Sequence, residues 1–208
     1  MRAAVMTNWQ LSIEELADPV PAAGQVLTRM RACGICGSDL HLLTHGREAR
    51  ELGDQLAADL PPDPLRPQPF DPARPMVMGH EFCCEVVELG PGCTNLQPGD
   101  LVVSLPIAFD ERGVHAIGFS NAYNGGYADL MVLNEMLCIK VPDGLTPRMA
   151  ALTEPLAVGV HAVAKSRIGQ GDAAIVLGCG PVGLAVIAEL RMRGIGPIVA
   201  ADFSPTRR

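Results

Sequence analysis

Several features that would place this chain in other protein classes are missing from its sequence. The longest apolar stretch, residues 173–188, falls short of the ~17–25 residues of a membrane span and contains three glycines and a proline. The N-terminus has no apolar h-region of a secretory signal. Sixteen basic residues against 23 acidic ones give a net charge of −7, which disfavours a nucleic-acid or anionic membrane surface. We therefore expect a cytoplasmic protein that binds neither membrane nor nucleic acid.

The seven cysteines include only one C-x-x-C pair, Cys33 and Cys36. A structural zinc ribbon needs two such pairs, and a disulfide framework is typical of exported chains with an even number of cysteines. A thioredoxin-like redox pair would lie beside a βαβ unit, whereas this pair lies far from the one described below. Reduced thiols are therefore expected. One alternative is that a single cysteine binds metal together with His80 and a carboxylate, as in a three-ligand catalytic zinc site.

The hydrophobic fraction of 48% and the mean hydropathy of +0.22 predict a substantial core. Short apolar runs broken by turn residues before residue 40 predict β-hairpins. Periodic spacing predicts an exposed amphipathic helix over residues 42–60, and a proline-rich loop follows it. Further predicted segments are strands at 81–90, 100–105, 127–133 and 138–141, and one long helix at 146–166.

The last part of the chain predicts one βαβ unit, with a strand at 173–177, a helix at 184–193 and a strand at 197–202. Between the first strand and the helix lies GCGPVG, which matches G-x-G-x-x-G, and its candidate cofactor-binding residues are Gly178, Gly180, Pro181, Val182 and Gly183. This context is that of a dinucleotide fingerprint: the glycines allow a tight turn, approach of the pyrophosphate and close helix–strand packing. Phosphates would meet the helix N-terminus. Asp202 would accept hydrogen bonds from the adenosine ribose, which favours NAD over NADP.

Taken together, the motifs resemble those of the zinc-dependent medium-chain alcohol dehydrogenase family. These are CGICGSDLH, GHE, VVELGPG, QPGDLVV, GGYADLMV and EPLAVGVHA, in that order before the fingerprint. The polyol and threonine dehydrogenase branch is the most similar. The resemblance implies an α/β protein with a GroES-like β-barrel catalytic domain at 1–150. A linker helix and the start of a Rossmann NAD-binding domain follow at 151–208. It also implies hydride transfer between an alcohol and NAD.

The family pattern assigns roles to residues of this chain. Cys36 and His80 match the zinc ligands, and Glu81 and Glu154 are alternative third ligands. Ser38 and His41 match the proton relay, and Asp39 the carboxylate that orients the ligand histidine. Arg207 matches a basic residue that contacts the adenosine ribose. We also expect the insertion at 42–75 to lie beside the substrate entrance.

Two departures from the family pattern carry further expectations. The segment 104–124 lacks the four cysteines that many members have there, so we expect one catalytic zinc, no structural zinc, and His115 as a solvated loop residue. The chain also stops after the second Rossmann strand, where family members continue for over a hundred residues. The complete form is expected to be a homo-oligomer. The alternatives are an inactive zinc- or nucleotide-binding fragment and a zinc-free quinone-reductase-like oxidoreductase.

Overall fold

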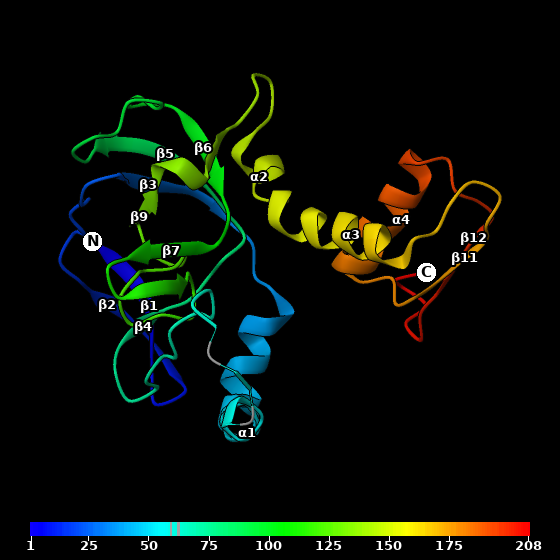
Figure 1. The fold of residues 1–208 in the computed structure, drawn as a ribbon, viewed down its shortest axis with the longest axis horizontal. Coiled ribbons are helices and arrows are strands. Elements are labelled where there is room, and N and C mark those ends of the chain that lie inside the picture. Colours follow the sequence, from blue (N-terminus) through cyan, green and yellow to red (C-terminus); the bar gives the residue numbers. More distant parts are fainter. Residues whose placement is uncertain (59, 62) are drawn as a thin grey trace. The chain divides into compact units, whose positions relative to one another are not determined.

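The computed structural model describes residues 1–58, 60–61 and 63–208, and it divides into two compact units, Met1–Ala151 and Leu152–Arg208. The first unit is mainly β-structure, and the second combines helices with a parallel pair of strands (Figure 1). This combination of a β-rich unit and a helix-and-strand unit agrees with the predicted α/β fold class.

A small three-stranded sheet begins the first unit. Strands β1 (Arg2–Thr7) and β2 (Gln10–Glu15) form the predicted antiparallel hairpin, and β4 (Met76–Val77) pairs with the other edge of β1. Asn8 and Trp9 form the hairpin turn, with φ of 52° and 67°. Two positive φ values in a two-residue turn match the twist of the flanking strands.

The main sheet of the first unit has five strands in the order β10-β6-β5-β3-β9. Their bounds are Gln25–Cys33 for β3, Phe82–Leu89 for β5, Leu101–Ser104 for β6, Leu130–Asn134 for β9 and Cys138–Lys140 for β10. A short 3-10 turn, η1 (Glu135–Leu137), joins the last two. The largest core cluster lies on this sheet and includes the fully buried Val26, Cys84 and Met131. Cys83 is also buried, as a small residue of a neighbouring core cluster.

Helix α1 (Gly37–Ala58) begins five residues earlier than predicted. The helix was predicted to end near Leu60. Asp59, directly before it, and Pro62, in the loop that follows, lie outside the described residues. The difference at the start arises because Asp39 caps the first turn by accepting from the Cys36 N–H, a signal that periodicity alone does not contain. Trp9 packs on Gly46, where no side chain separates helix from hairpin.

A second hairpin, β7 (Ile107–Asp110) and β8 (Gly113–Ala116), occupies the segment that lacks the family's four cysteines. The prediction that His115 is a solvated loop residue is wrong. His115 is 4% exposed, lies within β8 and places Nε2 3.0 Å from Oδ1 of Asp110. Tyr123 donates to the other oxygen of Asp110, and Gln25 donates to the Tyr123 hydroxyl. A hydrogen-bonded network therefore ties this hairpin to the main sheet.

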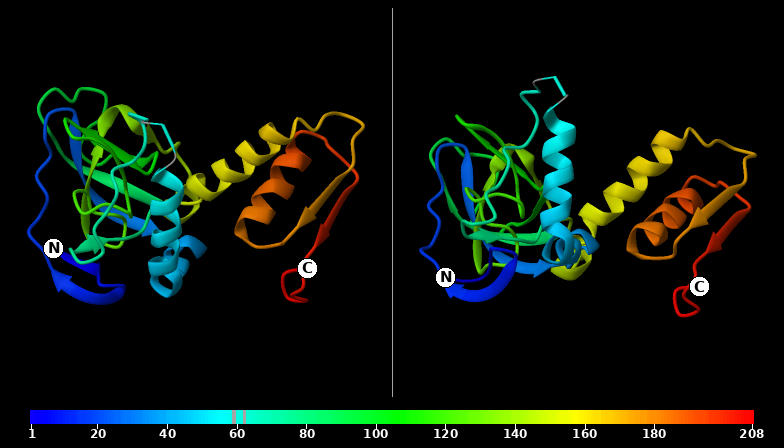
Figure 2. Two further views of the ribbon diagram at one scale, coloured as in Figure 1. Left: turned by 60° about the horizontal axis from the view of Figure 1, so that its bottom comes forward. Right: turned by 90° about the horizontal axis from the view of Figure 1, so that it is seen from below.

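The predicted helix at 146–166 is two helices, α2 (Pro147–Ala150) in the first unit and α3 (Thr153–Ser166) in the second. The second unit continues with β11 (Ala174–Leu177), α4 (Pro181–Met192) and β12 (Ile198–Ala201). Helices α3 and α4 run side by side (Figure 2), and Gly159 lies directly against Ala185 at their contact.

Strands β11 and β12 pair in parallel with Ile175 beside Val199. One face of this pair packs on α4 through Val176 and the half-buried Ile198, and the other exposes Ile175, Leu177 and Val199. Ile198 lies on the covered face because it is in register with the buried Ala174. No helix among the described residues is both long and apolar enough to cross a membrane.

Candidate functional site

The candidate metal centre lies where two neighbouring strands of the main sheet meet the loop before α1. Strand β3 ends at Cys33, and the next three residues lead to the first turn of α1. Strand β5 begins at Phe82, directly after His80 and Glu81, and pairs antiparallel with β3. The Gly34 N–H donates to the Glu81 carbonyl at 2.7 Å. Two segments more than forty residues apart are thereby held together.

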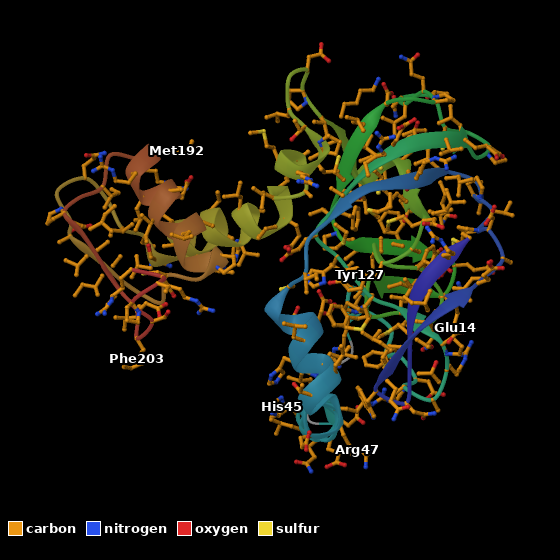
Figure 3. All side chains as sticks on the ribbon, turned by 180° about the vertical axis from the view of Figure 1, so that it is seen from behind. Glu14, His45, Arg47, Tyr127, Met192 and Phe203 are labelled. Atoms are coloured by element: carbon orange, nitrogen blue, oxygen red, sulfur yellow. The ribbon has the colours of Figure 1, made fainter. Side chains whose placement is uncertain are left out.

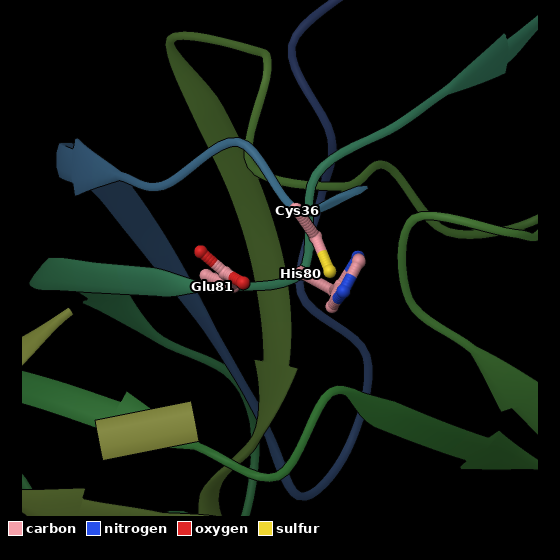
Figure 4. A group of neighbouring side chains, drawn as sticks. All are labelled: Cys36, His80 and Glu81. Carbon is pink, nitrogen blue, oxygen red and sulfur yellow. The ribbon is translucent and has the colours of Figure 1, made fainter. Parts of the chain in front are cut away.

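Three potential ligands meet at this point: the Cys36 Sγ, a ring nitrogen of His80 and a carboxylate oxygen of Glu81. These atoms all lie within 4.8 Å of one another, and Cys36 points its sulfur toward the His80 ring (Figure 4). A side chain on Gly34 would collide with the Glu81 carboxylate, so this glycine leaves the carboxylate its space. One thiol, one imidazole and one carboxylate suit a three-ligand zinc site with an open fourth position.

Asp39 lies behind His80, 1% exposed, with its Oδ1 3.4 Å from His80 Nδ1. Neither of these two buried atoms has a hydrogen-bond partner within good geometry among the described residues. The Asp39 carboxylate raises the pKa of His80 to about 9, against the opposing effect of burial. Because Nδ1 faces Asp39, Nε2 is the nitrogen left for a metal, an arrangement typical of ligand histidines.

Tyr127 is a site residue that we did not single out from the sequence. Its hydroxyl donates to Oδ2 of Asp39 at 2.7 Å and lies 3.3 Å from the Gly34 carbonyl. Figure 3 shows Tyr127 in the first unit, near the start of α1. Burial would raise the pKa of Asp39, but the facing His80 ring, together with hydrogen bonds from the Tyr127 hydroxyl and the Cys36 N–H, lowers it. The motif GGYADLMV contained the signal, since a tyrosine after two glycines can lie close to neighbouring backbone.

Cys33, the other cysteine of the C-x-x-C pair, is not part of the ligand group. Its thiol contacts the Gly34 carbonyl, and a side chain on Gly126 would collide with it. Burial raises the pKa of Cys33 to about 12, so it stays a thiol near neutral pH. Cys33 thus serves as a packing residue beside the site.

The other residues predicted for the zinc site and the proton relay lie on helices. Ser38 and His41 are exposed on the first turns of α1, at positions i and i+3 that share a helix face. The His41 ring stacks on His45 one turn later, with centroids 4.7 Å apart. Glu154 lies in the first turn of α3 in the second unit, and it stays a predicted ligand.

The glycine-rich loop joins β11 to α4, as the fingerprint predicts. Gly178 has a φ of 105°, which disfavours any side chain, and a side chain on Gly183 would collide with the Gly178 carbonyl. Pro181 begins α4, where a missing N–H costs nothing, and Val182 follows it, exposed. Gly180 precedes the helix, so the backbone around the helix N-terminus stays accessible.

Asp202 follows β12 and lines an open cavity of about 500 Å³ together with Gly178, Phe203 and Arg207. Its Oδ2 accepts from the Cys179 N–H at 2.8 Å and its Oδ1 from the Ser204 N–H at 2.7 Å. These backbone donors lower the pKa of Asp202. Each oxygen keeps a further lone pair for a ligand hydroxyl. Phe203 is fully exposed and projects from this unit (Figure 3).

Comparisons with known proteins agree with this architecture. The family model of the alcohol dehydrogenase GroES-like domain matches residues 22–143. The chain is 38% identical to the (R,R)-butanediol dehydrogenase of Bacillus subtilis (strain 168), over all of this chain and 60% of that protein. It is 32% identical to the sorbitol dehydrogenase of Gallus gallus, over 95% of this chain and 54% of that protein.

The fold is also found among solved structures. The crystal structure of 2R,3R-butanediol dehydrogenase from Bacillus subtilis has a TM-score of 0.79 and 35% identity, and the match covers 99% of this chain and 59% of that one. Two further solved structures with this fold contain a nucleotide, one NADP and the other NAD. The chain thus spans about 60% or less of the length of these relatives.

Proposed function

The chain belongs to the zinc-dependent medium-chain alcohol dehydrogenase family, and on that basis we propose that it contributes the catalytic centre of an enzyme that transfers hydride between an alcohol and NAD. The observation that carries the proposal is the group of Cys36, His80 and Glu81 with Asp39 behind the histidine. Butanediol and sorbitol dehydrogenases are among the relatives. Small polyols or diols are therefore the proposed substrate class.

Cys36, His80 and Glu81 would hold one zinc ion, with Glu154 as the alternative third ligand. Zinc bound there would supply Lewis-acid polarisation of the substrate hydroxyl. The chain's own residues perform the remaining tasks. Asp39 orients His80, and Ser38 accepts the substrate proton, which passes by way of His41 toward solvent. Asp202 and Arg207 would hold the adenosine end of NAD, whose nicotinamide ring would supply the hydride acceptor.

Zinc analysis of purified variants tests the metal centre. Cys36→Ser should abolish zinc retention, whereas Cys33→Ser should leave it nearly unchanged, because only Cys36 belongs to the ligand group. Equal loss in both variants would show that the two cysteines bind together and that the proposed site is wrong. Comparing Glu81→Ala with Glu154→Ala decides the third ligand, since only the true ligand should weaken zinc binding.

The reaction is tested by following NADH formation with butane-2,3-diol and sorbitol, using the whole protein to which this sequence belongs. Turnover that disappears with Ser38→Ala and Cys36→Ser but survives Cys33→Ser would support the proposal. Turnover that needs no zinc would favour a zinc-free reductase. Zinc retention without turnover of any alcohol would indicate a protein that binds zinc but does not catalyse the reaction.

A further inference from the structure

A second cavity lies on the first unit, beside the β7–β8 hairpin. Its volume is about 210 Å³, which corresponds to roughly seven water molecules. Polar or basic side chains make up most of its lining, which consists of Gln68, Pro69, Arg74, Arg112, His115, Ser120, Asn121 and Ala122. None of these described lining residues is acidic, although the chain as a whole has a charge of −7. The lining is therefore positive in an acidic protein.

Two buried side chains of the lining have hydrogen-bonding capacity left over. His115 is 4% exposed and uses Nε2 for Asp110, while its Nδ1 has no partner among the described residues and is not sealed off from solvent. Ser120 is equally buried, and its Oγ accepts from the Ala122 N–H, which leaves the hydroxyl proton to donate. The Ser120 hydroxyl can thus donate into the cavity, and His115 Nδ1 is a further polar atom without a partner.

The two arginines differ in what holds them. The Arg112 guanidinium is paired with Asp110, so its charge is partly balanced. Arg74 is exposed, and within the described parts of the chain its guanidinium has no ion-pair or hydrogen-bond partner. Asn121 positions the Arg74 backbone, because its side-chain amide donates to the carbonyls of Asp71, Arg74 and Pro75. The Arg74 backbone is therefore held at the rim, and its side chain contributes an unbalanced positive charge there.

From these contacts we propose that this cavity binds a phosphate group, either free or carried on a small metabolite. A tetrahedral oxyanion presents several acceptor oxygens, and the guanidinium and hydroxyl donors around this small cavity satisfy them, the guanidinium by charge-assisted hydrogen bonds. Gln68 adds an amide, whose nitrogen lies over Gly113. This site is separate from Cys36, His80 and Glu81, and it does not depend on the proposed dehydrogenase activity.

Calorimetric titration of the full chain with inorganic phosphate at low ionic strength tests the site. Saturable one-to-one binding is expected, and Arg74→Gln should weaken it by about tenfold or more. The matched control is Arg66→Gln, which removes the same charge from the same loop. Arg66 lies outside the cavity and donates to the Pro61 carbonyl. Its loss should change the affinity by less than about twofold.

Ser120→Ala should weaken binding as well, without altering the charge. Titration with glycerol 3-phosphate identifies the source: tighter binding than inorganic phosphate indicates an esterified phosphate, and weaker binding the free ion. The proposal is overturned by an absence of saturable binding or by equal weakening in Arg74→Gln and Arg66→Gln. Unchanged binding in Arg74→Gln overturns it too. Phosphate that is bound elsewhere on the protein, for example by a metal ion, would not depend on this arginine. Zinc content should be normal in every variant. Failure of the phosphate-site proposal would therefore not count against the proposed metal centre.

Discussion

At the scale of single residues, the candidate metal centre depends on side chains that support the ligands. Asp39 faces His80, and Tyr127 donates to Asp39 while its hydroxyl also lies close to the Gly34 carbonyl. This arrangement orients the imidazole and keeps Asp39 ionised. Mutation of a residue that supports a metal ligand in this way typically lowers metal affinity by about 10–100-fold.

Tyr127→Phe should therefore lower zinc affinity by about 10–100-fold, because Asp39 loses a donor and is less firmly positioned. Competition with a chromogenic chelator measures the change. Tyr123→Phe is the matched control, since it removes the chain's other tyrosine hydroxyl from the Asp110 network. Equal zinc affinity in the Tyr127 variant and the unmodified protein would show that Asp39 does not need this hydroxyl.

Asp202 carries the prediction of nucleotide preference. Its carboxylate is held ionised by two backbone N–H groups, so it should repel the 2′-phosphate of NADP. Asp202→Ser should reduce the preference for NAD over NADP by about tenfold, measured as a ratio of dissociation constants in the whole protein. Asp172→Ser, which changes another loop of the same unit, should leave the ratio unchanged. Better use of NADP by the unmodified protein would refute the assignment.

At the scale of elements, α1 offers two glycines in different surroundings. A side chain on Gly46 would collide with the Trp9 ring, whereas one on Gly53 would meet nothing among the described atoms within 4 Å. Gly46→Ala should therefore destabilise the first unit by about 1–3 kcal/mol through overpacking. Gly53→Ala should stabilise the helix by up to about 1 kcal/mol. Urea unfolding measures both, and a stable Gly46→Ala variant would mean that α1 does not dock on the hairpin.

The β7–β8 hairpin gives a pH-dependent prediction. Hydrogen bonds from Arg112 and His115 hold the pKa of Asp110 well below its usual range. A lowered carboxyl pKa in the folded state contributes stability above the unfolded pKa of about 3.9, and this contribution is lost as pH falls through the folded value. Asp110→Asn should therefore be less stable at pH 7 and lose less stability on acidification.

Unfolding in urea at pH 7 and pH 3 measures this difference. Asp143→Asn, at an exposed aspartate of the same unit, serves as the control and should change stability little at either pH. Parallel pH profiles of the Asp110 variant and the unmodified protein would show that the network is not coupled to the stability of the fold.

At the scale of the whole molecule, the two units differ in how well they cover their sheets. The five-stranded sheet buries Val26, Val86 and Met131 completely. The parallel pair in the second unit leaves Ile175 71% exposed and Leu177 82% exposed. A parallel sheet is normally covered on both faces. Stability should therefore be unevenly distributed between the units.

Hydrogen exchange should show this difference directly. Amides of β3, β5 and β9 are expected to be the most protected, and residues 168–208 should exchange faster under the same conditions. If added NAD slows exchange in the glycine-rich loop, that result would also support the proposed nucleotide site. Uniform protection across both units would contradict the prediction and indicate that the second unit is stable as it stands.

The sequence by itself determined the features that depend on a few neighbouring residues. The glycine pattern at 178–183, the strand before it, the helix after it and Asp202 at the end of the next strand all follow from local spacing. Cys36, His80 and the carboxylates were selected in the same way, by motif. The fold class followed because these signals occur in the order of a known family.

Tertiary structure alone decided the contacts between distant segments. Tyr127 reaches Asp39 across 88 residues, and His115 is buried because β8 pairs with β7 and Asp110 lies beside it. The start of α1 depended on a side-chain cap, Asp39 to the Cys36 N–H, which the periodicity of residues does not contain. Strand order and register set which side chains meet, and neither is visible in the spacing of residues along one strand.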